Sequence, residues 1–259
     1  MSTKSSDRVR ERQGTCRIIR GAPCPDPLTT ASLFPGVIVG EYLRRHMDLF
    51  RGRVLDLGAG NSPYAAWYSS RCDFVVTTDI AAHPGLSVIT GAEMLPFQDG
   101  SFDVVVATEV LEHVTDFEAS MHEIRRVLAP GGNVIITVPY FYPTHEPPHD
   151  HRRFTHHGLT ASLEARGLTV TNLTAKGGLL ALLSNFALTA ICMFLRQAML
   201  RSRSRKVGRI ILALLSTIER VLLSIRDVSP DFPRSANRVS LGYMAIAELN
   251  HVPADLGDD

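Results

Sequence analysis

The sequence has few cysteines and no excess of charge of either sign, and both shortages exclude classes of protein. Its four cysteines stand far apart without CxxC spacing, which argues against a disulfide framework and predicts reduced thiols in a cytoplasmic protein. The formal net charge is only +1, so no overall basic character points to a nucleic-acid partner. Residues 1–17 are polar and contain no apolar run, so a signal peptide is not expected and residues 1–30 are predicted to be a flexible tail.

The sequence does contain short apolar runs that alternate with helical stretches. Runs rich in Val, Ile and Thr, without polar alternation, are typical of strands buried on both faces; they cover 53–58, 73–80, 86–90, 102–109 and 133–140. Two further strands are expected over 168–175 and 239–249, and helices over 33–50, 62–71, 116–128 and 156–166. This alternation predicts an α/β fold: a Rossmann-like, seven-stranded, mostly parallel sheet with helices on both faces. The domain would comprise 31–175 and 239–259, with a helical insertion over 176–238.

A glycine loop follows the first strand of this sheet, where α/β sheets bind ligands. Gly58 and Gly60 would let the backbone approach a ligand closely. A dinucleotide fingerprint needs glycine at position 63, which is Pro63, and Asp56 is a poor neighbour for a pyrophosphate. An acid there suits a cationic ligand such as S-adenosylmethionine, and Asp79 stands at the spacing of a ribose-binding carboxylate. The alternative is a tight turn followed by a solvated acid.

Four motifs together resemble the class I S-adenosylmethionine-dependent methyltransferases, in the type 11-like branch whose members often act on small molecules. They are VLDLGAG, TTDI, GAEMLPFQDGSFDVVVATEVLEHV and RRVLAPGG, and the resemblance covers about residues 50–175 and, weakly, 239–249. It implies S-adenosyl-L-methionine as the cofactor. It also implies a methionine-side loop of Asp56, Gly58 and Gly60, ribose contacts by Asp79 and Ile80, adenine contacts by Ala92 and Glu93, and Thr108 and Glu109 under the methionine end.

Two positions depart from the family pattern. The third glycine of the loop is Ser62, and the position that often carries an adenine-facing aspartate is Gly91. Glu93 could replace that aspartate, or backbone alone could hold the adenine. The pair Glu112 and His113 is typical of the family, but capping and packing are favoured over catalysis for it.

Five of the ten histidines lie in HEPPHDHRRFTHH, residues 145–157, directly after the fifth strand. This loop is expected at the carboxyl edge of the sheet beside the methyl donor, where relatives commonly bind the acceptor. His145 and Asp150 are predicted to contact the acceptor or act as general base. Arg153 would hold an anionic acceptor group or pair with Asp150, and Phe154 is assigned to acceptor binding.

The same loop could instead bind a metal ion. His145, His149 and His151 could supply nitrogens to zinc, but Pro147-Pro148 prevents a shared helix face and no HExxH is present. No bound metal is therefore expected. The remaining histidines of the loop are predicted to be exposed, with Thr155 capping the next helix; they are His151, His156 and His157.

The insertion contains 17 uncharged residues (179–195), a basic stretch (196–209) and an amphipathic stretch (210–225). This pattern predicts two helices joined by a basic turn. They could form a cap that packs on the sheet or on a second subunit of a homodimer. They could instead make a peripheral membrane contact through 179–225. A membrane span is the third alternative, although 179–195 as a helix would reach only roughly 25 Å of a hydrocarbon core of roughly 30 Å.

These observations predict an enzyme, an S-adenosylmethionine-dependent methyltransferase that acts on an O or N atom of a small-molecule acceptor. The apolar insertion favours a hydrophobic or lipid- or glycan-linked acceptor, and a location in the cytoplasm or at the inner face of the membrane. One alternative is a non-catalytic S-adenosylmethionine-binding or membrane-associated scaffold protein. Another is a zinc-dependent hydrolase that uses the His145–His157 cluster.

Overall fold

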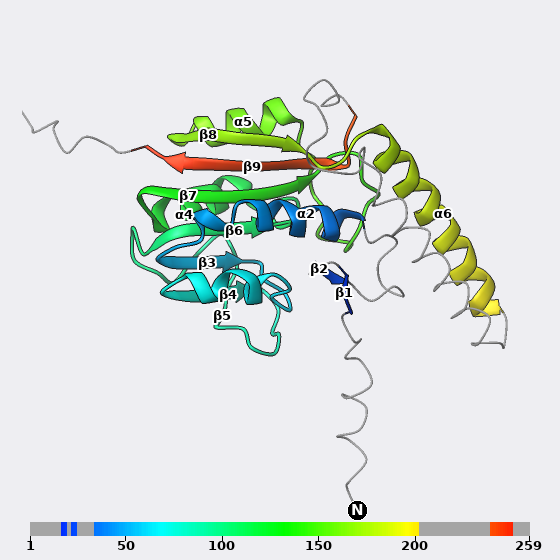
Figure 1. The fold of residues 1–259 in the computed structure, drawn as a ribbon, viewed down its shortest axis with the longest axis horizontal. Helices are drawn as coiled ribbons and strands as arrows, with labels where there is room; N and C mark the ends of the chain where they lie inside the picture. Colours follow the sequence, from blue (N-terminus) through cyan, green and yellow to red (C-terminus); the bar gives the residue numbers. More distant parts are fainter. Residues whose placement is uncertain (1–16, 20–21, 25–33, 202–238, 251–259) are drawn as a thin grey trace, which may run out of the picture.

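A computed structural model describes residues 17–19, 22–24, 34–201 and 239–250. Its central feature is a seven-stranded sheet with the strand order β5-β4-β3-β6-β7-β9-β8, in which β9 is antiparallel to both neighbours (Figure 1). The predicted seven-stranded, mostly parallel sheet is confirmed. The strands are β3 (Arg53–Leu57), β4 (Phe74–Asp79), β5 (Val88–Ile89), β6 (Phe102–Thr108), β7 (Leu128–Pro139), β8 (Leu168–Ala175) and β9 (Gly242–Leu249).

Helices cover both faces of the sheet because alternate side chains of each strand point to opposite sides. On one face, α4 (Phe117–Val127) and α5 (His156–Glu164) pack on a cluster that includes Leu55, Val105 and Ile136. On the other face, α2 (Phe34–Arg45), α3 (Ala65–Tyr68) and α6 (Leu179–Arg201) pack on a cluster that includes Val54, Val104 and Ile135. Two short 3-10 helices complete the described helices; they are η1 (Met47–Leu49) and η2 (Ser69–Arg71).

Element boundaries differ from the predicted ones in places. The helix expected over 62–71 is only α3 followed by η2, because the turn of the glycine loop continues to Tyr64. The helix expected over 33–50 is divided into α2 and η1. Strand β7 begins at Leu128, which pairs with Phe102 before a shift in register. The proline and glycines after Leu128 therefore form an irregularity within the strand rather than a connection outside it.

The segment predicted to be a flexible tail includes two short antiparallel strands among its described residues. Strand β1 (Arg17–Ile19) pairs with β2 (Ala22–Cys24). The rest of residues 1–30 lies outside the described residues.

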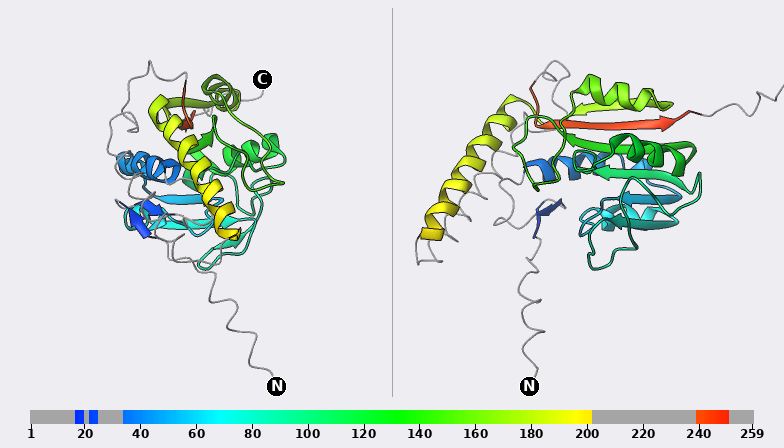
Figure 2. Two further views of the ribbon diagram at one scale, coloured as in Figure 1. Left: turned by 90° about the vertical axis from the view of Figure 1, so that its right-hand side faces the viewer. Right: turned by 180° about the vertical axis from the view of Figure 1, so that it is seen from behind.

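Helix α6 is longer than predicted and runs from Leu179 to Arg201, into the expected basic turn 196–209. The sequence after residue 195, RQAMLR, consists of good helix formers, so nothing ends the helix there. Figures 1 and 2 show α6 beside the end of the sheet toward which the parallel strands point. The second predicted helix, 210–225, lies outside the described residues.

One face of α6 packs against the fold, and another is apolar and exposed. Ala181, Leu182 and Leu188 join the buried cluster that contains Ile38 of α2. The exposed apolar side chains of the helix are Leu179, Leu180, Leu183, Phe186, Ile191 and Phe194. In the part of the chain that the structure describes, no helix combines the length and apolar character that a membrane span requires.

Candidate functional site

The glycine loop leaves β3 in a left-handed backbone conformation. Gly58 has φ +63° and Gly60 has φ +53°. Ser62, which stands where relatives have the third glycine, has φ 48°, and its N–H donates to the Ala59 carbonyl at 2.7 Å. The Ala59 N–H in turn donates to the Thr78 carbonyl of β4 at 2.8 Å. Serine at position 62 therefore leaves the turn of the loop intact.

The two glycines differ in the space around them, and this difference is testable. A Cβ at Gly58 would lie 2.4 Å from Cγ2 of Val110, whereas nothing lies within 4 Å of a Cβ at Gly60. Both alanine variants should lose roughly 1 kcal/mol because of the left-handed backbone. Gly58→Ala should lose about 1 kcal/mol more because its methyl group overpacks the site. Urea denaturation of both variants measures this difference, and equal losses would contradict it.

Asp79 ends β4 and holds the glycine loop. Its Oδ2 accepts a hydrogen bond from the Gly60 N–H at 2.9 Å, and its Oδ1 accepts one from the Ala81 N–H at 2.9 Å. Each carboxylate oxygen keeps a free lone pair, so both can still accept hydrogen bonds from a ribose. Ile80, next in the chain, is 79% exposed and offers an apolar surface beside this acid. The open space at Gly60 and these free acceptors fit S-adenosylmethionine.

Asp56 lies deeper than the sequence suggests. It is buried, and Oδ2 accepts a hydrogen bond from the Tyr68 hydroxyl at 2.5 Å. Burial raises the pKa of Asp56 to about 6; the Tyr68 hydrogen bond opposes this rise, and the charge of Asp79 adds to it. Asp56 is therefore a buried acid at the base of the glycine loop, and its action on a cationic ligand stays a prediction.

The residues predicted to lie along the adenine occupy the segment after β5. Ala92 is buried, and the Glu93 carboxylate accepts a hydrogen bond from the Thr115 N–H at 3.1 Å. A Cβ at Gly91 would lie 2.8 Å from the same carboxylate. Glu93 thus fills the space beside Gly91, where relatives often carry the adenine-facing aspartate.

Thr108 and Glu109 end β6 at the same edge of the sheet. Glu109 has φ 55°, and its Oε1 accepts hydrogen bonds from the Thr137 hydroxyl at 2.7 Å and from Lys176 Nζ at 2.5 Å. Lys176 is almost fully buried. Sequence reasoning missed this lysine, although its position directly after β8 places it at the carboxyl edge. The Lys176–Glu109 ion pair thus lies where the methionine end of the cofactor is predicted to bind.

The histidine loop docks on the turn between β6 and α4. Arg152 donates to the carbonyls of Leu111, Val114 and Thr115. The backbone N–H of His151 donates to the Glu112 carbonyl at 2.9 Å. These contacts join the predicted acceptor loop to the segment that follows Glu109, and Arg152 is a second residue that sequence reasoning missed.

Asp150 and Arg153 form an ion pair, which is one of the two alternatives predicted for Arg153; its contact with an anionic acceptor group stays a prediction. The guanidinium contacts both carboxylate oxygens, at 2.5 and 2.7 Å, and also donates to the carbonyls of Tyr142 and Pro143. The Arg153 hydrogen bond holds the pKa of Asp150 well below its usual range. Asp150 also accepts a hydrogen bond from the His145 backbone N–H at 2.9 Å, so it positions His145 and is a poor general base.

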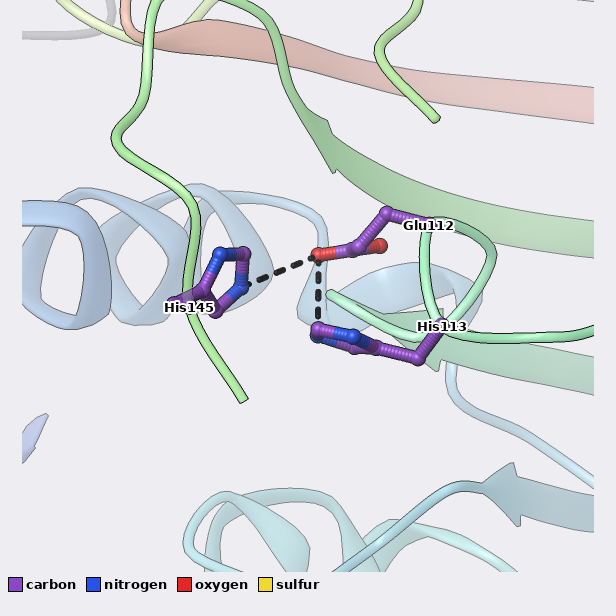
Figure 3. A group of neighbouring side chains, drawn as sticks. All are labelled: Glu112, His113 and His145. Carbon is purple, nitrogen blue, oxygen red and sulfur yellow. Dashed lines mark ion pairs between the residues drawn. The ribbon is translucent and has the colours of Figure 1, made fainter. Parts of the chain in front are cut away.

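Glu112, His113 and His145 converge at this docking point, and Figure 3 shows both imidazoles directed at one carboxylate oxygen. Glu112 Oε1 lies 3.6 Å from His113 Nε2 and 3.9 Å from His145 Nε2. Glu112 is fully buried, and burial holds its pKa well above the usual range. Burial and the neighbouring His113 lower the pKa of His145, which favours its neutral form. Glu112 and His113 lie on a turn and cap no helix.

Other predicted residues of the loop lie outside this cluster. Phe154 is 8% exposed and packs on Phe117 with ring centroids 5.3 Å apart, as part of the apolar core; its contact with the acceptor stays a prediction. His151 and His157 are exposed, as expected, while His156 is half-buried beside Tyr243. The Thr155 side chain accepts a hydrogen bond from the Gly158 N–H, which confirms the predicted helix cap; none of the three histidines enters the cluster.

Comparison with known proteins finds similarity to methyltransferases over the central part of the sheet. A family model described as a methyltransferase domain matches residues 55–136. A demethylmenaquinone methyltransferase of Streptomyces avermitilis is 32% identical over 105 residues, which are 37% of this chain and 45% of that protein. Methyltransferase GfsG of Streptomyces halstedii is 33% identical over 129 residues, which are 43% of this chain and 45% of that protein. The chain therefore spans about half the length of the curated relatives it matches.

Solved structures share the fold at low sequence identity. The cyclase SpnF superposes with a TM-score of 0.55 at 18% identity, covering 86% of this chain and 84% of SpnF. A protein described as a putative sarcosine dimethylglycine methyltransferase from Galdieria sulphuraria gives a TM-score of 0.53 at 15% identity, covering 89% and 92%. At this identity the likeness extends to the fold alone.

Proposed function

Because the chain carries a methyltransferase domain of the class I family, whose methyl donor is S-adenosylmethionine, we propose that it methylates an O or N atom of a small-molecule acceptor. The observation that carries this proposal is the contact between Gly60 and Asp79. This hydrogen bond holds the glycine loop against Asp79, the carboxylate that is predicted to bind the ribose. A donor bound there would direct its methionine end toward Glu109 and the histidine loop.

The residues around the acceptor would align an in-line displacement, in which the acceptor atom attacks the methyl carbon and the sulfonium leaves. Alignment and exclusion of water are the main contributions of such a site. His145 is half-buried, and its lowered pKa keeps it neutral near pH 7, so it can accept the proton of an acceptor hydroxyl. Asp150, fixed by Arg153, is a positioning residue for His145.

The character of the acceptor is proposed from α6. The helix lies beside the carboxyl edge of the sheet and carries exposed apolar side chains, which supports a hydrophobic or lipid- or glycan-linked acceptor. The same exposed side chains support a location in the cytoplasm at the inner face of a membrane. They equally support contact with a second copy of the chain. Vesicle flotation and light scattering would separate these two arrangements.

A second candidate is an S-adenosylmethionine-binding protein that does not transfer the methyl group. SpnF, described as a cyclase, shares the fold, so the fold alone does not carry the activity. Turnover of the donor to S-adenosylhomocysteine in lipid extract would separate the two functions, because a scaffold should produce none. The zinc hydrolase has less support, because the exposed His149 and His151 stand apart from the converging side chains.

The proposal is tested by calorimetric titration of S-adenosylhomocysteine into wild type and Asp79→Ala. Wild type should bind at micromolar concentration. The variant should bind at least tenfold more weakly, about 1.4 kcal/mol, because it loses the ribose acceptors. Asp73→Ala, an exposed acid beside the opposite end of β4, is the matched control and should bind like wild type. Absence of binding by folded wild type would overturn the proposal.

A further inference from the structure

We propose that Glu112, His113 and His145 form a binding site for one divalent transition-metal cation. One ligand atom of each residue lies within 4.8 Å of the other two. The expectation of no bound metal rested on a different set, in which His149 and His151 joined His145. In the described residues, the potential ligands come instead from two segments, the β6–α4 turn and the loop after β7.

Both imidazoles are oriented as metal-binding histidines usually are. The Nδ1 atom of His113 lies 2.8 Å from the carbonyl oxygen of His149. The Nδ1 atom of His145 lies 3.3 Å from Asp150 Oδ2, an attractive distance although the angle is outside hydrogen-bond geometry. Oxygens behind Nδ1 favour a proton on that nitrogen and leave the Nε2 lone pair free. Both free lone pairs then face Glu112.

Glu112 supplies the second, independent observation. It is 0% exposed, and neither carboxylate oxygen has a hydrogen-bond partner among the described residues. An unsatisfied buried carboxylate is costly and calls for an explanation such as an ion. The nearby cations are engaged elsewhere, since Lys176 contacts Glu109 and Arg153 contacts Asp150. Three electron-pair donors therefore meet, and neither of these basic side chains pairs with Glu112.

The donor set selects the class of cation. Two imidazoles and one carboxylate suit zinc, iron, cobalt or manganese better than calcium. Ligand bonds of about 2.1 Å would bring the ligand atoms to roughly 3.4 Å apart. The distances of 3.6 and 3.9 Å from Glu112 Oε1 then shorten by roughly 0.2 and 0.5 Å, and the distance between the two imidazole nitrogens, which is within 4.8 Å, by up to roughly 1.4 Å. Three protein ligands leave coordination positions open. If the proposed methyl transfer holds, an acceptor hydroxyl could occupy one of them, and the cation would lower the pKa of that hydroxyl. The cation would then replace His145 as the group that activates the acceptor, because the Nε2 lone pair of His145 would be used for coordination.

The test uses Co²⁺ as a spectroscopic probe of the chelator-treated full chain. Visible absorption and calorimetry should show one equivalent bound by wild type. Binding should weaken at least tenfold in Glu112→Gln, His113→Asn and His145→Asn. His122→Asn, which replaces an imidazole with 73% side-chain exposure on α4, is the matched control and should bind like wild type. Thermal melts without metal verify folding, and Glu112→Gln should fold well because it removes a buried carboxylate without partners.

Two results would overturn the metal site. Wild type could bind no Co²⁺, as expected if a proton shared with Glu112 replaces the cation. All variants could instead bind alike, which would indicate adventitious coordination. Titration of S-adenosylhomocysteine into the same samples separates this proposal from the proposed function: Co²⁺ binding without S-adenosylhomocysteine binding supports the metal site alone, and the reverse supports the donor site alone.

Discussion

Lys176→Met should lower the free energy of unfolding by about 3 kcal/mol, the lower end of the range for breaking a buried ion pair. The lysine is 1% exposed and lies 2.5 Å from Glu109, whose side chain is 30% exposed. Its removal leaves the Glu109 carboxylate without this cation. The charge of Glu109 already raises the pKa of the nearby Glu112, so the two acids would then repel each other without compensation. Urea denaturation at neutral pH measures the loss.

A double-mutant cycle isolates the ion pair from the loss of lysine packing. Glu109→Gln keeps the shape of the side chain and removes its charge. The double variant should therefore be more stable than Lys176→Met alone, with a coupling energy of at least 1 kcal/mol. Additive losses would show that the pair contributes only packing. Arg44→Met, which breaks a largely exposed ion pair with Glu41, is the control and should change stability far less than Lys176→Met, because solvent screens an exposed pair.

Asp56→Asn should change how stability depends on pH. The Asp56 pKa is about 6 in the fold against an ordinary 3.8. Between these values the unfolded chain has lost the proton and the folded chain retains it, so wild-type stability falls as pH rises. The asparagine variant has no such proton. Its stability relative to wild type should therefore increase by about 3 kcal/mol from pH 3.5 to pH 7.

The measurement is a series of denaturant titrations of both proteins across this pH range. Taking the difference between the two proteins removes the contributions of all other titrating groups. Asp48→Asn, on an exposed surface, is the matched control and should show a much smaller change. A constant difference between Asp56→Asn and wild type would contradict the prediction. Donor affinity should fall in Asp56→Asn, because the variant lacks the negative charge beneath the loop.

The sheet could be predicted from sequence because strands buried on both faces leave a continuous apolar run. Strand β8 was predicted with the bounds it has, 168–175, and β3 to within one residue. The ends of helices were harder to predict. Helix α6 continues past residue 195 because the residues that follow, RQAMLR, are good helix formers. The irregular start of β7 depends on its pairing with Phe102, which local sequence does not reveal.

The donor side of the candidate site was easier to predict than the acceptor side. Gly58, Gly60 and Asp79 lie within a short stretch whose spacing is tied to one turn. Lys176 is 67 positions from Glu109 in the sequence, and their pairing follows only from the strand order. From the sequence, Glu112 and His113 are predicted to be capping and packing residues. Only the tertiary contact with the histidine loop shows that they face His145. Contacts between distant segments carry this part of the site.

The connection between β8 and β9, which contains the insertion, begins and ends at adjacent positions of the sheet. The Lys176 N–H donates to the Gly242 carbonyl at 2.8 Å, and the Leu241 N–H donates to the Lys176 carbonyl at 3.1 Å. The chain thus leaves and re-enters the sheet at one point, where antiparallel neighbours could be joined by a tight hairpin. Residues 177–240 therefore lie between two positions that hydrogen bonds already join, so the strand order does not set the length of this connection. Its first helix is still part of the fold, because Ala181, Leu182 and Leu188 pack in the buried cluster.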